Sequence, residues 1–217
     1  MNAGPAPTYA YELGEALYLN VTSACTLACV FCPKIRDDNW VVGGFDLKLA
    51  RPPTADEVWA QVTRHGLAGR PEVVFTGLGE PTRSLAVLLD VTRRLKAAGV
   101  GRVRLDTDGL ANLREGRDVT AELAEAGLDA VVVSLNAPDA GTYVRLCPNR
   151  HGEAAWHAAR AFLRAAIPRL ASVEASFVAV PGLSEDACRR EAEGLGARFR
   201  WRPYDRVGRL RELGGNA

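Results

Sequence analysis

The chain is 217 residues long and nearly neutral, with 27 Lys and Arg against 26 Asp and Glu and a formal net charge of +1. This balance gives no overall field for binding a nucleic acid or an anionic membrane, and no apolar run approaches the ~20 residues of a membrane-spanning helix. The first 20 residues contain no Lys or Arg and no long apolar stretch, so we expect no secretory signal there. Five cysteines, three of them clustered, are typical of a protein in the reducing cytoplasm.

In chain order, the sequence predicts a flexible start over residues 1–10, a core domain over 11–205 and a loose tail over 206–217. Alternating patterns predict strands at 17–21, 73–76, 103–106, 130–134, 173–179 and 199–202. Thr54 and Glu57 form a capping box for a first helix, and apolar spacing predicts others at 82–98, 117–126, 153–166 and 184–195. An inserted segment, 34–53, contains a V-V-G-G-F pattern that favours a small hairpin.

Strands that alternate with helices predict an α/β fold, here a partial (β/α)6 TIM-like barrel with mostly parallel strands. One side of most predicted strands is apolar, as at Leu17 and Leu19, and should pack on the helices. The other side is polar, although a closed barrel fills its interior with branched apolar residues. The sequence therefore predicts an open interior that holds a hydrophilic ligand; the alternative is that some strands are edge strands with a solvated face.

Three arginines share this inward parity: Arg104, Arg200 and Arg202. Guanidinium groups suit planar, bidentate binding of a carboxylate or phosphate. The hypothesis is that they bind an anionic ligand, and the alternative is that they pair with acidic side chains inside the barrel, namely Glu174, Asp106 and Asp108.

The run C-T-L-A-C-V-F-C places Cys25, Cys29 and Cys32 in the pattern C-x3-C-x2-C after the first predicted parallel strand. Three thiolates on one loop can hold three irons of a [4Fe–4S] cluster and leave one iron open, and an open position is what a catalytic metal site retains. Zinc with a distant fourth ligand, or three reduced cysteines without a metal, remain alternatives.

Further unusual residues follow the other strands, where ligands of parallel barrels bind. They are G-L-G-E-P at 77–81, D-T-D-G at 106–109 and S-L-N-A-P at 134–138. The carboxylate of Glu80 can accept hydrogen bonds from an ammonium group, and the two glycines allow close approach of the backbone to a ligand.

Together, these motifs resemble the core of radical S-adenosylmethionine (SAM) enzymes. The sequence around these motifs is most similar to that of the small TatD-linked radical SAM proteins. The similar segments are Y-L-N-V-T-S-A-C, V-F-T-G-L-G-E-P and S-L-N-A-P-D-A-x-T-Y, with L-C-P following. The resemblance implies a [4Fe–4S] cluster on Cys25, Cys29 and Cys32, with SAM bound at the open iron.

The resemblance also implies contacts with SAM. Phe31 would help to hold the adenine, and Glu80, with the backbone of Gly77 and Gly79, would receive the methionyl ammonium. Ser134 and Asn136 would reach the ribose or the carboxylate. Arg202 is a further candidate for the SAM carboxylate because of its inward parity, and not because of the resemblance. Asp106 and Asp108 lie where many members of the family have T-N-G. Two roles are therefore left open for these aspartates: contact with SAM, or a purely structural role in the turn.

The implied reaction is reductive cleavage of SAM, with an electron from flavodoxin or ferredoxin, followed by hydrogen abstraction from an unidentified, anionic substrate. A small molecule is favoured over a protein as substrate. Cys147 is a candidate hydrogen-atom donor, with a passive buried cysteine as its alternative. Alternative functions are a glycyl-radical activase, a 7-carboxy-7-deazaguanine synthase-like enzyme, and a non-catalytic iron–sulfur or zinc protein that transfers electrons.

Overall fold

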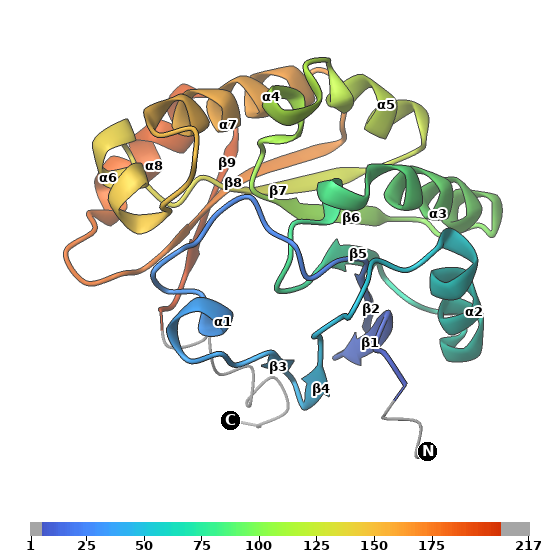
Figure 1. Ribbon diagram of the computed structural model, residues 1–217. Helices are drawn as coiled ribbons and strands as arrows, with labels where there is room; N and C mark the ends of the chain where they lie inside the picture. The colour runs from blue at the N-terminus through green and yellow to red at the C-terminus, as the bar shows by residue number, and fades with distance from the viewer. Residues whose placement is uncertain (1–5, 205–217) are drawn as a thin grey trace, which may run out of the picture.

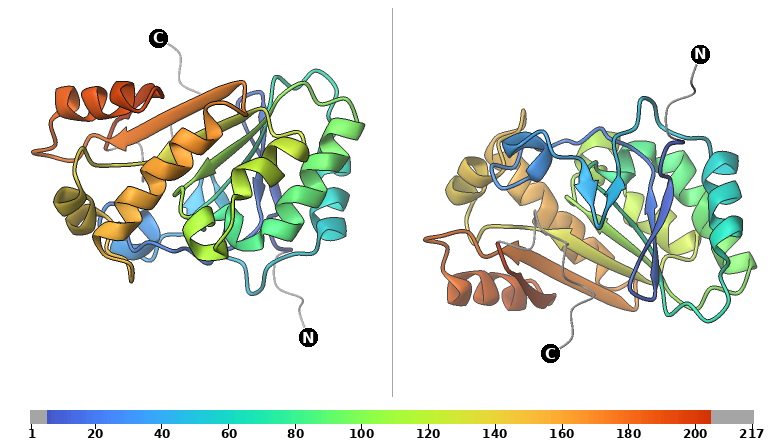
Figure 2. Two further views of the ribbon diagram at one scale, coloured as in Figure 1. Left: turned by 90° about the horizontal axis from the view of Figure 1, so that it is seen from above. Right: turned by 90° about the horizontal axis from the view of Figure 1, so that it is seen from below.

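The computed structural model describes residues 6–204, which form one curved sheet with helices on its outside (Figures 1 and 2). Neighbouring strands pair in the order β1-β2-β5-β6-β7-β8-β9, and all pairs are parallel except β1 with β2. The strands are β1 Ala10–Leu13, β2 Ala16–Asn20, β5 Val73–Thr76, β6 Val103–Thr107, β7 Ala130–Ser134, β8 Ser172–Val178 and β9 Arg198–Arg202. The predicted α/β fold, a partial TIM-like barrel with mostly parallel strands, is confirmed.

Helices connect the parallel strands and cover the convex face of the sheet (Figure 1). They are α2 Ala55–His65, α3 Leu85–Ala97 preceded by the 3-10 turn η1 Pro81–Ser84, α4 Ala111–Glu115, α5 Val119–Glu125, α6 Ala140–Leu146, α7 Glu153–Ala166 and α8 Glu185–Gly194. A short helix, α1 Pro33–Arg36, and the predicted hairpin, β3 Val41–Val42 with β4 Phe45–Asp46, lie on the open side of the curved sheet. No helix within residues 6–204 is long and apolar enough to cross a membrane.

Local signals set where several helices begin. The capping box before α2 is present: the N–H of Glu57 donates to Thr54 Oγ1 over 3.2 Å, and the N–H of Thr54 donates to Glu57 Oε2 over 2.8 Å. Ser184 caps α8 by accepting from the N–H of Ala187. These bonds satisfy backbone donors that the first helical turn leaves without a partner.

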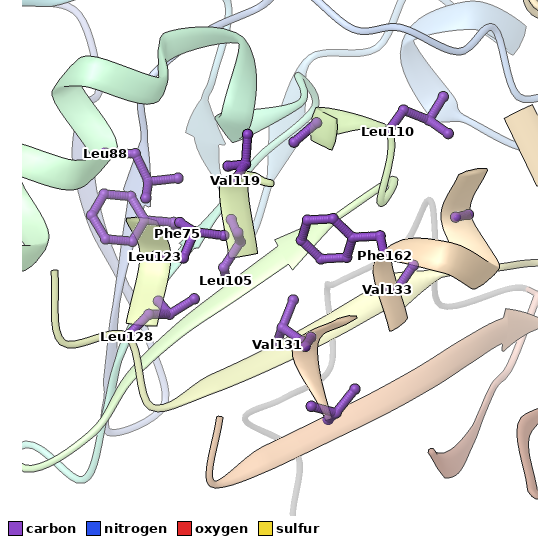
Figure 3. Close-up of a cluster of buried hydrophobic side chains, with 14 of the residues drawn as sticks. Phe75, Leu88, Leu105, Leu110, Val119, Leu123, Leu128, Val131, Val133 and Phe162 are labelled. Atoms are coloured by element: carbon purple, nitrogen blue, oxygen red, sulfur yellow. The ribbon is translucent and has the colours of Figure 1, made fainter. Parts of the chain in front are cut away.

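The core lies between the sheet and its outer helices. The apolar side of the sheet's strands from β2 to β8 is buried there, as the alternation predicts, and that of β9 is partly buried. Figure 3 shows this cluster, in which strand residues face residues of α3, α5 and α7; its labelled members include Phe75, Leu105, Val131, Val133, Leu88, Leu123 and Phe162. Because this face provides the packing, the other face of the strands is free to carry polar side chains.

The structure differs from the prediction at the start of the sheet. Residues 6–10 were expected in a flexible segment, but Tyr9 and Ala10 are buried and their N–H groups both donate to Gln61 Oε1 over 2.9 Å. Ala10 also begins β1, an antiparallel strand whose four residues are too few to show a clear alternation. Residues 1–5 and the expected tail at 206–217 lie outside the described residues.

Two helical stretches also differ from the prediction. The helix expected at 117–126 is α5, which begins after its cap Asp118, and a separate α4 precedes it and ends at Gly116 in the left-handed conformation with φ 66°. Helix α6, which was not predicted, begins after Asp139, whose side chain accepts from the N–H of Thr142 over 2.8 Å. The seven residues of α6 span barely two turns, so periodicity alone gives a weak signal.

Candidate functional site

The three-cysteine loop follows β2 and runs into α1, and all three cysteines are partly buried. The loop is tied to the chain just after α6: the N–H of Ala28 donates to the carbonyl of Pro148 over 2.9 Å, and that of Val30 to the carbonyl of Leu146 over 3.0 Å. These bonds hold the loop at the carboxyl ends of the parallel strands.

The same ties place a fourth cysteine against the loop. Cys147 is fully buried, and its Sγ lies 3.4 Å from Sγ of Cys29. Nδ2 of Asn136 donates to the Cys147 sulfur over 3.6 Å. The structure therefore places the predicted hydrogen-atom donor beside a predicted cluster ligand, whereas Cys188 is buried in α8 as a core residue.

Burial makes the free thiolates costly in this loop. It raises the pKa of Cys25 to about 12 and also raises the pKa of Cys32, and contact with Cys147 together with burial raises the pKa of Cys29. Thiolates in such surroundings are stabilised by a bound cation, and metal binding releases their protons.

No group of three or more His, Cys, Asp or Glu within residues 6–204 is arranged to hold a single metal ion. A four-iron cluster binds one thiolate at each of its irons and so spaces its ligands more widely than one zinc ion does. Three partly buried cysteines on one loop supply the three thiolates that such a cluster with one open iron requires.

Glu80, predicted to receive an ammonium group, is 2% exposed and already binds the protein. Its Oε1 accepts from the N–H of Thr82 over 2.9 Å, from Thr82 Oγ1 over 2.6 Å and from Thr107 Oγ1 over 2.8 Å, while Oε2 accepts from the N–H of Asp108 over 2.6 Å. Glu80 therefore links the turn after β5 to the end of β6. Because Oε2 accepts a single bond, it keeps capacity for one more donor.

The two glycines of the G-L-G-E-P turn are required by close packing. A side chain at Gly77 would place its Cβ 2.8 Å from Asn20 Oδ1, and φ at Gly77 is +133°. A Cβ at Gly79 would collide with the carbonyl of Thr22 and lie 3.0 Å from that of Ala24. The turn thus packs directly on the backbone of the cysteine loop.

Asp108 and Asp106 differ in their surroundings. Asp108 is 5% exposed; its Oδ1 accepts from the N–H of Leu110 over 2.9 Å, which is a turn role, while Oδ2 is buried without a hydrogen-bond partner. Burial, and then the charge of Glu80, raise the pKa of the Asp108 carboxyl. Asp106 lies 3.1 Å from Arg104 Nη1, an ion pair whose geometry leaves Asp106 Oδ1 without an aligned hydrogen bond.

The remaining predicted residues lie at the end of β7 and in the cysteine loop. Asn136 is 1% exposed and has φ 56°, a conformation that asparagine tolerates, and its Oδ1 has no partner. Ser134 ends β7, two residues before Asn136. Phe31 is buried in the hydrophobic cluster on which Cys25 and Cys29 pack.

Some residues of the site were not predicted. Tyr143 and Ser176 are fully buried, and their hydroxyls have no hydrogen-bond partner among the described residues. Ser176 has the inward parity of β8, which could have indicated it. Tyr143 precedes Cys147 by one helical turn, but it could be found only by recognising α6.

Buried polar atoms without partners are rare in proteins. Within residues 6–204 they gather on the inward parity of the strands and around the cysteine loop; they are on Asn20, Thr26, Arg104, Asp106, Asp108, Asn136, Tyr143, Ser176 and Arg202. Such open donors and acceptors fit a polar ligand in the barrel, as the sequence predicted.

The fold and the site define a partial TIM-like barrel with a three-cysteine loop at the carboxyl ends of its strands. Residues 19–193 match the radical SAM superfamily, and the chain belongs to that superfamily of enzymes. No curated protein matches the chain.

Solved structures share the fold at low identity. A radical SAM methyltransferase from Sphaerobacter thermophilus is 21% identical, with a TM-score of 0.63, over 94% of this chain and 66% of its own. Methylornithine synthase is 15% identical, with a TM-score of 0.59, over 87% and 53%. The protein anSMEcpe, solved with AdoMet bound, is 14% identical, with a TM-score of 0.59, over 86% and 50%. The chain thus spans two thirds or less of the length of these structures.

Proposed function

We propose that this protein is a radical SAM enzyme that abstracts hydrogen from a small-molecule substrate. The observation that carries the proposal is the three-cysteine loop, which is held over a barrel whose interior has open, buried donors and acceptors. When bound, a [4Fe–4S] cluster with SAM would supply a 5′-deoxyadenosyl radical by one-electron reduction.

The protein's own residues would bind and orient these groups. Cys25, Cys29 and Cys32 would hold three irons, and the backbone of Gly77 and Gly79 would line the SAM site. Glu80 would accept one hydrogen bond from the methionyl ammonium with the remaining capacity of Oε2, while its other bonds fix the turn.

Further contacts with SAM would come from polar side chains near the carboxyl ends of the strands. Asn136 and Ser134 would contact the ribose, and the free Oδ2 of Asp108 would accept a hydroxyl. Phe31 would pack near the adenine. We assign Asp106 to the substrate side of the lumen, because it lies among the arginines there.

We also propose that the protein is one of the small TatD-linked radical SAM proteins and takes its electron from flavodoxin or ferredoxin in the cytoplasm. The similarity of the sequence around the three motifs to that of the TatD-linked proteins supports this assignment. Open polar atoms inside the barrel favour a small substrate over the glycyl radical site of a partner protein.

The first test is anaerobic reconstitution with iron and sulfide, followed by SAM and dithionite. We expect 5′-deoxyadenosine, measured by mass spectrometry, and its loss in Cys29→Ala. The matched control is Cys188→Ala, which removes a buried cysteine of α8 far along the chain from the loop and should retain both cluster and product.

If the protein binds iron and sulfide but forms no 5′-deoxyadenosine, either with or without a metabolite extract, the result would favour a non-catalytic iron–sulfur protein. Zinc retained in place of iron would contradict the cluster itself.

We further propose Cys147 as the hydrogen-atom donor that completes the reaction. Its S–H bond would break as the substrate radical takes the hydrogen atom, and one electron and one proton from the reductant would restore the thiol. Its burial, and its position 3.4 Å from Cys29 Sγ, support a place beside the reacting groups.

For Cys147→Ala we expect normal 5′-deoxyadenosine formation but loss of the substrate product. The substrate source would be a metabolite extract, with product defined by mass signals that require both SAM and dithionite. The Cys188→Ala variant is again the control, and an unchanged product in Cys147→Ala would rule out the donor role.

A further inference from the structure

Most arginines on the inner face of the sheet are neutralised by acidic side chains. Nη2 of Arg104 lies 3.2 Å from Glu72 Oε1, and its Nη1 lies 3.1 Å from Asp106 Oδ1. At the other edge of the sheet, Arg198 lies 2.5 Å from Glu174.

Arg200 shares that same carboxylate, because its Nη1 lies 3.6 Å from Glu174 Oε2. For Arg104 and Arg200 the structure thus confirms pairing within the barrel, the alternative that the sequence left open.

Arg202 is different. Within residues 6–204 it forms no ion pair, and its Nε is buried without a hydrogen-bond partner. Burial lowers its pKa, although a guanidinium keeps its proton in proteins. Arg202 is partly buried and has no ion-pair partner among the described residues, so a bound anion would stabilise it.

The surroundings of Arg202 offer further groups to a ligand. Ser176 has the inward parity of β8 and is fully buried with no hydrogen-bond partner for its Oγ among residues 6–204. In the register of the sheet it lies opposite Arg200, and Arg202, opposite Val178, is its diagonal neighbour on the same face. Asp106 lies close enough for its charge to act on Arg202, as do the sulfurs of Cys29 and Cys147. The free guanidinium edge and hydroxyl therefore lie between the barrel interior and the cysteine loop.

We propose that Arg202 and Ser176 form a subsite for the carboxylate of a small, monoanionic substrate. This inference rests on the proposed function and deepens it, because it names the class of substrate. The free Nε and the adjacent Nη would bind the two carboxylate oxygens side by side, and Ser176 Oγ would donate to one of them.

The position of Arg202 favours the substrate over SAM as the source of the carboxylate. Three strands separate β5, which precedes the Gly77–Glu80 turn, from β9, which carries Arg202. Four strand spacings amount to about 19 Å along the curved sheet. Because the ammonium and carboxylate of SAM sit on one carbon atom, we assign both to the Gly77–Glu80 side and Arg202 to the substrate, and the SAM affinity of the Arg202 variant tests this assignment.

The charge of the subsite favours a carboxylate over a phosphate. The neighbouring arginines are already paired with Glu72, Asp106 and Glu174. The guanidinium of Arg202, which has no ion pair within residues 6–204, balances one negative charge, whereas a phosphate carries nearly two at neutral pH.

The test uses the reconstituted protein with SAM and propionate as the probe. Binding would be measured by saturation-transfer-difference NMR titration, with propionamide as the neutral isostere and inorganic phosphate as the competing anion. The variant is Arg202→Met, and the matched control is Arg200→Met, because Arg200 is paired with Glu174 and its side chain is 42% exposed.

We expect Arg202→Met to weaken propionate binding about tenfold or more, since a hydrogen-bonded charge is lost. Arg200→Met should change the affinity by no more than about twofold. Propionamide and phosphate should bind much more weakly than propionate, and SAM affinity by equilibrium dialysis should not change in either variant.

Equal propionate binding in the wild type and Arg202→Met would overturn the subsite, and so would a loss of SAM affinity in Arg202→Met. If circular dichroism shows Arg202→Met to be unfolded, Arg202→Lys decides: weaker propionate binding supports the subsite, and unchanged binding overturns it. Propionate binding is measured without SAM cleavage, so absence of 5′-deoxyadenosine would count against the proposed function alone.

Discussion

At the scale of single residues, Glu80 carries the most connections in the site. Its carboxylate accepts four hydrogen bonds from Thr82, Thr107 and Asp108. These bonds join the turn after β5 to the end of the neighbouring strand β6. Hydrogen bonds to a charged, buried acceptor are among the stronger ones in proteins. Glu80 therefore organises the protein around the proposed SAM site, in addition to its proposed contact with the ligand.

We expect Glu80→Gln to lower the free energy of unfolding by about 1–3 kcal/mol, because one oxygen becomes an NH2 group. The new NH2 group would point at one of the donors that now bond to the carboxylate. If the NH2 group takes the place of Oε2, the buried N–H of Asp108 loses its acceptor. Urea unfolding measures the change.

The control for Glu80→Gln is Glu185→Gln, an exposed residue whose pair with Arg189 spans one helical turn. It should change stability by less than about 0.5 kcal/mol. Unchanged stability in Glu80→Gln, together with lost SAM binding, would show instead that Glu80 acts only on the ligand.

At the scale of elements, the site is an assembly of loops that pack on one another. The cysteine loop is bonded to the end of α6, and the turn after β5 is bonded to the cysteine loop, because the N–H of Glu80 donates to the carbonyl of Ala24 over 2.8 Å. Gly79 makes the second contact possible, since it has no Cβ to strike the Thr22 carbonyl. The geometry of the cysteines therefore depends on a glycine more than 40 residues further along the chain.

We expect Gly79→Ala to destabilise the protein by about 1–3 kcal/mol, because the added methyl group forces two backbone segments apart. It should also reduce the iron and sulfide bound after reconstitution, measured per protein by colorimetric assay, because the cysteine loop shifts.

Gly194→Ala is the matched control for that prediction. Gly194 is the last residue of α8, and a Cβ there meets no atom within 4 Å. Alanine in this position should stabilise the protein by up to about 1 kcal/mol and leave iron content unchanged. Equal iron content in Gly79→Ala and the wild type would contradict the packing argument.

At the scale of the whole molecule, the curved sheet separates packing from chemistry. Its outer face meets the helices with fully buried apolar residues, whereas its inner face carries ion pairs and open polar atoms. Six parallel strands point their carboxyl ends to one side, so loops from distant parts of the chain meet there. The partial barrel thereby carries polar groups on its inner face, where a closed, filled barrel carries branched apolar side chains.

Much of this could be predicted from the sequence because the signals are local. The short apolar runs at Val73–Thr76 and Ala130–Ser134, the capping box at Thr54 and the cysteine spacing each depend on a few neighbouring residues. The short elements β1 and α6 were missed because four and seven residues leave too little pattern to recognise.

The sequence by itself determined the order of the elements, the polar lumen and the three-cysteine motif. Only the tertiary structure decided that Cys147 contacts Cys29, which lies 118 residues away in the chain, and that groups of the protein itself fill most of the hydrogen-bond capacity of the Glu80 carboxylate. It also decided that Arg104 and Arg200 form ion pairs, whereas Arg202 forms none within residues 6–204. The physical reason is that alternation assigns a side chain to a face of the sheet, but strand register and loop closure decide which donors and acceptors on that face come within bonding distance.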